Sequence, residues 1–364
     1  MKGKFKLLKV DKYIIGKFLG TFVFMITLII SISVVFDINE KIDKFISNSA
    51  PLHAIIFDYY VNFVPYYANL FSPLFIFLAV IFFTSKMAGN SEIIAILSNG
   101  MSFKRLLRPY MISAGIIALV SFVMGGYIIP PANKNRIEFE QTYVDQRKKK
   151  TGDRDIQFKV DKNTIVYFGN FDMESSTGYN FSIDHFDSLQ LVSRLTAQSI
   201  KYDSLYNWTI SDYQIREFDG MTETITKGKE IDTIITIVPN DFVVAKTDQQ
   251  MMTTPQLKRH IESQQERGLG NVQAFQIEYH SRYASVFSAF ILTIIGASLS
   301  ARKVKGGMGL NIGLGLALSM AYILFMTVSS SFAVKGSMSP FLAAWIPNII
   351  FIGVAFFTYK KAPS

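Results

Sequence analysis

Cysteine is absent from this 364-residue sequence, which excludes disulfides, thiolate metal sites and cysteine nucleophiles. The motifs of several enzyme classes are absent as well. No GxxxxGK(S/T) phosphate loop, HExxH zinc motif or GxSxG nucleophile elbow occurs. Acidic residues are almost excluded from the long apolar runs, so no intramembrane proton relay stands out. The sequence therefore predicts a non-catalytic chain with no cofactor and no metal site.

Apolar residues make up 49% of the sequence, and they gather in its first third and last quarter. The middle is polar, so we expect a membrane protein with a sizeable soluble insert rather than a soluble protein with a large core. Six apolar runs are candidate membrane spans, at about residues 14–36, 55–84, 110–129, 284–300, 308–332 and 340–358.

The net charge of +9 is concentrated in alternate connections between the predicted spans. This pattern places both termini inside by the positive-inside rule. The polar middle mixes acids with bases, so a nucleic-acid partner is not expected. The basic residues are Lys2, Lys4, Lys6, Lys9, Lys12 and Lys17, then Lys86, Lys104, Arg105 and Arg108, then Arg302, Lys303 and Lys305, and finally Lys360 and Lys361.

The polar middle, residues 155–244, alternates apolar and polar side chains with a period of two, and turn signals separate the runs. Several short strands at this spacing predict an antiparallel sandwich or jelly roll. Aromatic residues on the inward face are core candidates before they are ligand contacts. These candidates are Phe181, Phe186, Tyr206 and Trp208.

The segment SEIIAILSNGMSFKRLLRP, residues 91–109, predicts a short helix between two spans. Ser91 is the expected N-cap, Glu92 suits the helix dipole, and Asn99-Gly100 is a stop signal. One interpretation is a helix lying flat in the lipid headgroups. The other is a knob that docks into a soluble partner, which suits a transporter without an energy source of its own. The expected apolar face consists of Ile93, Ile94, Ile96 and Leu97.

Three further features concern the spans. The first span ends in a mixed-charge stretch, which is either a solvated helix extension or a site where Lys41 or Lys44 faces an anionic ligand. Pro65 and Pro73 are expected to kink the second span, whose polar groups serve either helix packing or a substrate path. The fifth span carries GLNIG, residues 309–313, a small-xxx-small pattern that predicts close helix approach.

Several of these segments together resemble the LptF/LptG family, the permease subunits of the lipopolysaccharide-export ABC transporter. The resemblance covers essentially the whole chain and rests on the order of the segments around a β domain. They are KVDKYIIGKFLGTF and VVFDINEKIDKFI in the first span, Pro65 and Pro73 in the second, SEIIAILSNGMSFKRLLRP, IEYHSRYASVF before the fourth span, and SPFLAAWIPNIIF in the sixth.

The resemblance implies an α+β membrane protein of the inner membrane, with six transmembrane helices and a periplasmic antiparallel β-jellyroll inserted between helices 3 and 4. The expected division is residues 1–131 for helices 1–3 with a cytoplasmic coupling helix at 91–100, residues 132–254 for the jellyroll with its exit stalk, and residues 255–364 for a linking helix and helices 4–6.

The resemblance also implies partners and site residues. The partners are an LptB-type ATPase dimer, a second LptF/LptG-type permease, an LptC-type periplasmic protein, lipopolysaccharide and membrane lipid. Lys41 and then Lys44 match basic residues that contact the anionic headgroup in the family, and Arg136 is added by its position on the exit stalk. The residues expected to couple to the ATPase are Glu92, Ile93, Ile96 and Leu97.

A second functional hypothesis is a mechanotransmission or sensor subunit, whose β domain binds a protein partner and whose spans move no lipid. An intramembrane enzyme is disfavoured because the catalytic constellations are missing. The resemblance does not decide between an F-like and a G-like subunit, although the first span is closer to a G-like one.

Overall fold

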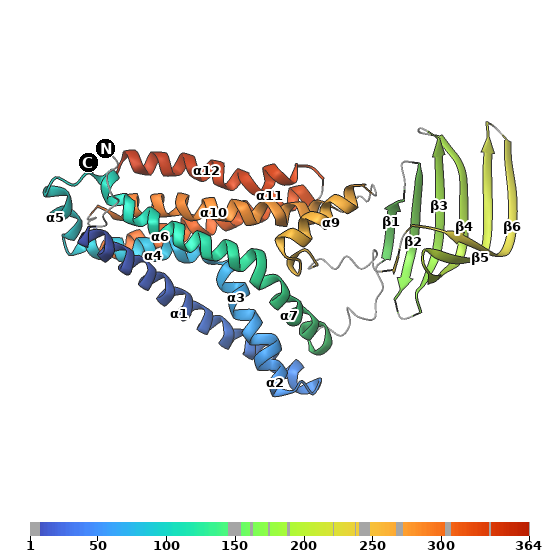
Figure 1. Cartoon of the computed structure of the whole chain (residues 1–364), viewed down its shortest axis with the longest axis horizontal. Coiled ribbons are helices and arrows are strands. Elements are labelled where there is room, and N and C mark those ends of the chain that lie inside the picture. Colours follow the sequence, from blue (N-terminus) through green and yellow to red (C-terminus); the bar gives the residue numbers. More distant parts are fainter. Residues whose placement is uncertain are drawn as a thin grey trace. The chain divides into compact units, whose positions relative to one another are not determined.

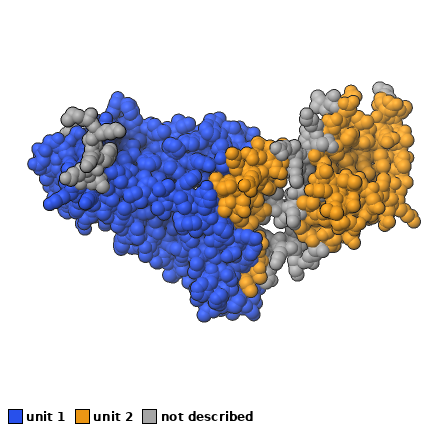
Figure 2. All heavy atoms as spheres, in the orientation of Figure 1, with its two compact units in different colours: residues 1–139, 276–364 blue, residues 140–275 orange. Residues whose placement is uncertain are grey.

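The computed structural model describes residues 8–144, 154–160, 163–173, 175–187, 190–220, 222–236, 238–239, 248–266, 272–302, 307–334 and 336–363. Contacts between Cα atoms divide the chain into two units, shown in Figure 2. Unit 1 consists of residues 1–139 and 276–364, and unit 2 of residues 140–275. Five lysines of the charge pattern lie outside the described residues: Lys2, Lys4, Lys6, Lys303 and Lys305.

Unit 1 is helical, and the described chain has six helices long and apolar enough to cross a membrane, as the sequence predicts. α6, η2 and α7 form one of these six continuous stretches. The elements are α1 (Lys9–Ser47), α2 (Leu52–Ala54), η1 (Ile55–Tyr60), α3 (Val61–Leu70), α4 (Ser72–Gly89), α5 (Glu92–Ser98), α6 (Phe103–Val123), η2 (Met124–Ile128), α7 (Ile129–Tyr143), α10 (Gln273–Ser300), α11 (Gly307–Val334) and α12 (Pro340–Lys360).

The second predicted span, residues 55–84, is interrupted beside Pro73, where a kink is expected, and its extent is wrong because only α4 is a candidate span. The helix stops at Leu70 and restarts at Ser72, with Phe71 outside helical geometry at φ −91° and ψ 7°. Pro73 explains the break, because it has no N–H to donate to the carbonyl of Asn69 and its ring would clash with that carbonyl in a continuous helix. In the first turn of α4 the missing N–H costs nothing. α3 and α4 consequently run in different directions (Figure 1), and α4 alone is long and apolar enough to span.

The spans differ in how much of their surface the chain itself covers. α4 packs against both α1 and α11, and 67% of its apolar window is buried. The corresponding values are 11% for α1 and 22% for α11. Helices that are apolar all round but mostly uncovered need lipid or another protein around them. The apolar, largely uncovered surfaces of α1 and α11 therefore fit helices that lie in a bilayer.

In the described residues of unit 2, six strands form an antiparallel sheet and follow one another in sequence order. The antiparallel strands are confirmed, while closure into a jelly roll stays a prediction. Of the predicted core aromatics, Trp208 and Phe181 are fully buried and pack in one cluster. The strands are β1 (Arg154–Lys159), β2 (Thr164–Asp172), β3 (Thr177–Asp187), β4 (Gln190–Ser204), β5 (Asn207–Asp219) and β6 (Thr222–Ile234), and helix α9 (Thr254–Glu266) follows.

The other two predicted core aromatics behave differently. Phe186 is half-buried at a register shift between β3 and β4. Tyr206 is 37% exposed, so its assignment to the core is wrong. It lies in the turn between β4 and β5 with a φ of +70°, and a left-handed turn residue no longer follows the alternation of the strands.

The close helix approach predicted for GLNIG is also wrong in its position. A Cβ added at Gly309 or Gly313 would meet no other part of the described chain within 4 Å. The tight contact lies two residues later, where a Cβ at Gly315 would collide with Cδ1 of Ile81 on α4. Gly315 is therefore the glycine that lets α11 approach α4.

We expect Gly315→Leu to lower the free energy of unfolding in mixed detergent by about 1–3 kcal/mol. The added side chain would have to displace Ile81, which is fully buried and closely packed. Gly313→Leu is the matched control, since it adds the same side chain on the same helix into open space. Equal unfolding midpoints for the two variants would contradict this assignment of the α4–α11 contact.

Candidate functional site

α5 is a two-turn helix at the end of unit 1 where α1 begins and α12 ends (Figure 1). The predicted stop is confirmed, because Gly100 has a φ of +82° and Asn99 Nδ2 donates to the Ala95 carbonyl at 2.7 Å. The predicted side-chain cap is wrong, because Ser91 has a φ of +62° and its side chain makes no cap hydrogen bond. Capping serines use extended geometry instead.

Three of the four side chains on the predicted apolar face of α5 pack against the rest of unit 1, and the fourth is exposed. Ile93 is buried in the same core cluster as Ile14 and Phe18 of α1, while Ile96 and Leu97 pack partly against that cluster. Ile94, by contrast, is 51% exposed. α5 is therefore fixed to its own helical bundle along one side and presents a smaller apolar surface on the other.

Glu92 connects α5 to the first span. Tyr13 of α1 donates its hydroxyl to Glu92 Oε2 at 3.0 Å, and Asn90 Nδ2 donates to the other carboxylate oxygen at 3.2 Å. The carboxylate also lies at the first residue of α5, where the helix dipole favours a negative charge. A displacement of α5 would therefore act on α1 through this hydrogen bond as well as through Ile93.

A second connection at this end of unit 1 joins α1 to α6. The guanidinium of Arg105 donates to both oxygens of Asp11, at 2.7 and 2.6 Å, and the Leu8 amide donates to the same carboxylate at 2.9 Å. Asp11 is only 2% exposed. Ser102 caps α6, because its Oγ accepts a hydrogen bond from the Arg105 amide at 3.3 Å. This cap fixes the first turn of α6, which carries the Arg105 side chain.

The sequence-based reasoning missed both Asp11 and Tyr13. The sequence signal of Asp11 is weak, because it is a single acid within the basic segment before the first span. An acid at N3 of a helix is usually explained by local capping, and Asp11 does accept from Leu8 in this way. Its partner Arg105 is 94 residues away in the chain, so only the fold could show the pair.

Lys41 lies at the opposite end of α1 and is partnered within the chain. Its ammonium forms a 2.9 Å ion pair with Asp37 and a hydrogen bond with the Tyr59 hydroxyl. Tyr60 donates to the second oxygen of Asp37 at 3.0 Å. This cluster joins α1 to η1, and it leaves 15% of the Lys41 side chain exposed. The positive charge of Lys41 is therefore partly balanced within the chain.

Arg136 on α7 is also packed inside unit 1. It is 5% exposed, its Nε donates to Asn133 Oδ1 at 2.7 Å, and its guanidinium lies over the ring of Tyr66 at 4.7 Å. The Tyr67 ring lies 5.7 Å away. Arg136 thus joins α7 to α3 by cation–π contacts.

The structure brings Lys41 and Arg136 to the same end of unit 1 but separates both from α5. Tyr59, the partner of Lys41, contacts Phe45 at a ring distance of 5.9 Å and Phe139 of α7 at 5.3 Å. Lys44 lies in the last turn of α1 and is exposed. Of the three predicted headgroup contacts, Lys44 is therefore the one whose charge faces outward in this conformation.

The comparison with known proteins comes from a family model. The model described as "Lipopolysaccharide export system permease LptF/LptG" matches residues 12–361, nearly the whole chain. No curated protein matches the chain. The matched range includes Tyr13, Glu92, Arg105, Lys41, Lys44 and Arg136.

We expect Asp11→Ala and Arg105→Ala each to lower the thermal unfolding midpoint, because either change leaves the other charge without its partner. The double variant should lose less than the sum of the single losses, since the pair acts as a unit. Lys12→Ala, an exposed neighbour, serves as control. Additive losses in the double-mutant cycle would show that the pair does not join α1 to α6.

Proposed function

The chain belongs to the LptF/LptG family of lipopolysaccharide export permeases, and from this premise we propose how it works. As a member, it is a multi-pass inner-membrane protein with the role of a lipopolysaccharide export permease. We propose that it is an ABC-transporter subunit which extracts lipopolysaccharide from the inner membrane and passes it to a periplasmic bridge. Partner ATPases supply the energy, and the chain itself is non-catalytic.

One observation carries the ATPase-driven mechanism. α5 is short, partly exposed, and connected to α1 by the Glu92–Tyr13 hydrogen bond and by the buried Ile93. An LptB-type ATPase dimer that docks on α5 and closes on ATP would move α1 through these contacts. Glu92, Ile93, Ile96 and Leu97 are the coupling residues of this proposal, and Ile94 adds an exposed apolar side chain to the docking surface.

The orientation in the membrane follows from charge. Lys86, Lys104 and Lys360 all lie at the α5 end of unit 1, so the positive-inside rule puts this end in the cytoplasm. The six-stranded sheet then belongs to a periplasmic β-jellyroll domain, inserted between the third and fourth spans. We keep the division into residues 1–131, 132–254 and 255–364 as part of the proposal.

The proposed partners in the membrane follow from the uncovered spans. α1 and α11 both pack on α4, and they are the two spans that the chain covers least. We propose that a second LptF/LptG-type permease covers part of these two helices and that the substrate cavity lies between the two permeases. An LptC-type protein would contact the periplasmic domain.

The substrate contacts are proposed at the periplasmic end of α1. Lys44 is exposed there, and Lys41 can reach an anionic headgroup if it leaves Asp37. Arg136 acts in this proposal through its cation–π contacts with Tyr66 and Tyr67, which fix the position of α7. An exposed ion pair at such a site contributes at most about 1 kcal/mol.

We expect Glu92→Lys to abolish export and the coupling of ATP hydrolysis while the chain stays membrane-inserted. The lysine removes the acceptor for Tyr13 and places a positive charge at the first residue of α5. Lipopolysaccharide release and ATPase activity of the assembled complex are the measurements. Glu92→Gln keeps an oxygen acceptor and should retain more activity. Normal export by Glu92→Lys would contradict the coupling role.

A crosslinking experiment separates lipid export from the sensor hypothesis. A photo-reactive amino acid replaces Lys44 or Ile183, which is half-buried against the core of the sheet. We expect lipopolysaccharide adducts at both positions, and none at Lys12 near the α5 end. Adducts with protein alone would favour a mechanotransmission or sensor subunit that moves no lipid.

A further inference from the structure

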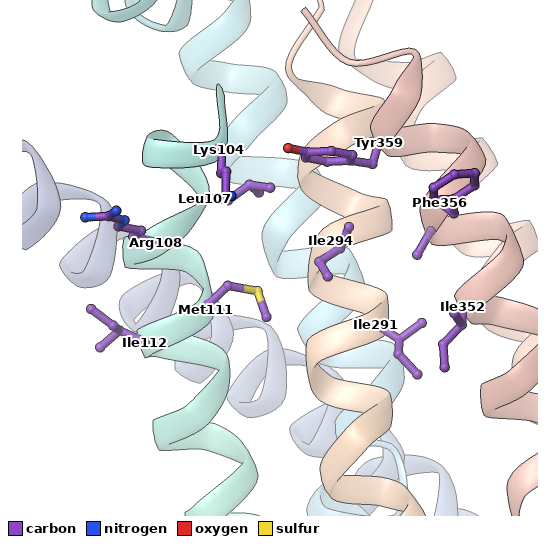
Figure 3. A pocket seen from close by; sticks show the side chains of 11 residues that line it. Lys104, Leu107, Arg108, Met111, Ile112, Ile291, Ile294, Ile352, Phe356 and Tyr359 are labelled. Carbon is purple, nitrogen blue, oxygen red and sulfur yellow. The ribbon is translucent and has the colours of Figure 1, made fainter. Parts of the chain in front are cut away.

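A groove of about 730 Å³ opens on the surface of unit 1 between α6, α10 and α12 (Figure 3). Its floor is formed by Leu107, Ile291 and Ala355, which are all buried. Its rim includes Ile352 and Phe356, which are 54% and 60% exposed and so face the surroundings of the helices. The volume is in the range of sites that hold small molecules.

The polar groups of the groove gather at its α5 end. Lys104 lies in the first turn of α6, and the hydroxyl of Tyr359 points from α12 toward α6 (Figure 3). Lys360 does not line the groove, but its ammonium lies beside it, 4.6 Å from the ring centroid of the groove-lining Phe356. Arg108 also lines the groove, but its guanidinium points away from α10 and α12 (Figure 3). This end of the groove is therefore cationic and has a hydroxyl donor.

Nothing in the described part of the chain neutralises this end of the groove. Its lining includes no acidic side chain. Neither Lys104 nor Lys360 forms an ion pair with a carboxylate among the described residues. A complementary ligand would carry a negative charge at this end and an apolar body along the rest of the groove.

The length of the groove fits one leaflet of a bilayer. Lys104 and Met111 are seven residues apart on α6, and Tyr359 and Ile352 are seven residues apart on α12. Seven residues of α-helix extend about 10 Å. Half of the hydrocarbon core is about 15 Å thick. The charges would therefore lie at the level of the headgroups, with the apolar lining beside the acyl chains.

We propose that this groove binds an anionic glycerophospholipid of the phosphatidylglycerol type, from the leaflet at the α5 end. The phosphate would lie against Lys104 and the Tyr359 hydroxyl, which line the groove, with the charge of Lys360 beside it, and an acyl chain would lie on Leu107 and Ile291. Basic pockets between membrane helices recognise anionic lipid headgroups in this way. The site lies at the opposite end of unit 1 from Lys41 and Lys44, and it involves neither α1 nor α11.

Native mass spectrometry of the purified full chain tests this proposal, with phosphatidylglycerol and phosphatidylethanolamine of the same acyl chains as probes. We expect preferential retention of phosphatidylglycerol. Each cation should contribute about fivefold to the affinity, so the double variant Lys104→Gln, Lys360→Gln should bind about 25-fold more weakly. Lys86→Gln removes an exposed charge from the same end of unit 1, outside the groove, and should leave binding unchanged.

Two further arms test the acyl chain and the source of the phosphate. Met111→Trp fills the apolar part of the groove and should reduce retention of phosphatidylglycerol without a change of charge. Inorganic phosphate in excess should not displace the lipid, because it lacks the apolar body. The proposal is overturned if both lipids are retained equally, if the double variant or Met111→Trp binds as the parent does, or if inorganic phosphate displaces the lipid.

Discussion

The ion pair between Asp11 and Arg105 is the contact on which the arrangement of the α5 end depends. α5 and α6 are both attached to α1 at this end. Arg105 joins α6 to α1 through Asp11, and Glu92 joins α5 to α1 through Tyr13. A carboxylate that is 2% exposed requires such partners, since an unpaired buried charge is strongly unfavourable. α1, α5 and α6 therefore form one connected body.

The π-helical segments and the break within the second span lie away from this body. The π-helical segments η1 and η2 and the break at Phe71 all belong to the part of unit 1 beyond the regular helices of the α5 end. Gly125 in η2 lies close to Asn69 of α3, since a Cβ there would come within 2.8 Å of its side chain. π-bulges are frequent at functional sites. η1 carries Tyr59, the partner of Lys41, and η2 leads directly into α7, which carries Arg136.

The sequence predicted the long elements well and the contacts between them poorly. Hydropathy and charge were enough for six spans, and period-two alternation for the strands, because both signals are local. The close approach at Gly315 instead depends on Ile81, a neighbour in space. The break at Phe71 and the left-handed turn at Tyr206 depend on local backbone geometry that hydropathy and alternation do not report. Position in the sequence is the only signal that marks Arg136, and the fold shows that tyrosine rings and Asn133 surround it.

If Lys41 contacts the lipid headgroup as proposed, its partners within the chain bear on how an anionic lipid could be both held and released. Its ammonium already has Asp37 and Tyr59 as partners, so in the proposed contact a headgroup would compete with an internal carboxylate rather than meet a free charge. Competition of this kind lowers the affinity, and it also restores a satisfied site once the lipid leaves. Because Tyr59 belongs to η1, a rearrangement of this π-helical turn would alter the balance between the two anions. Weak, conformation-dependent binding suits a protein that passes its substrate onward.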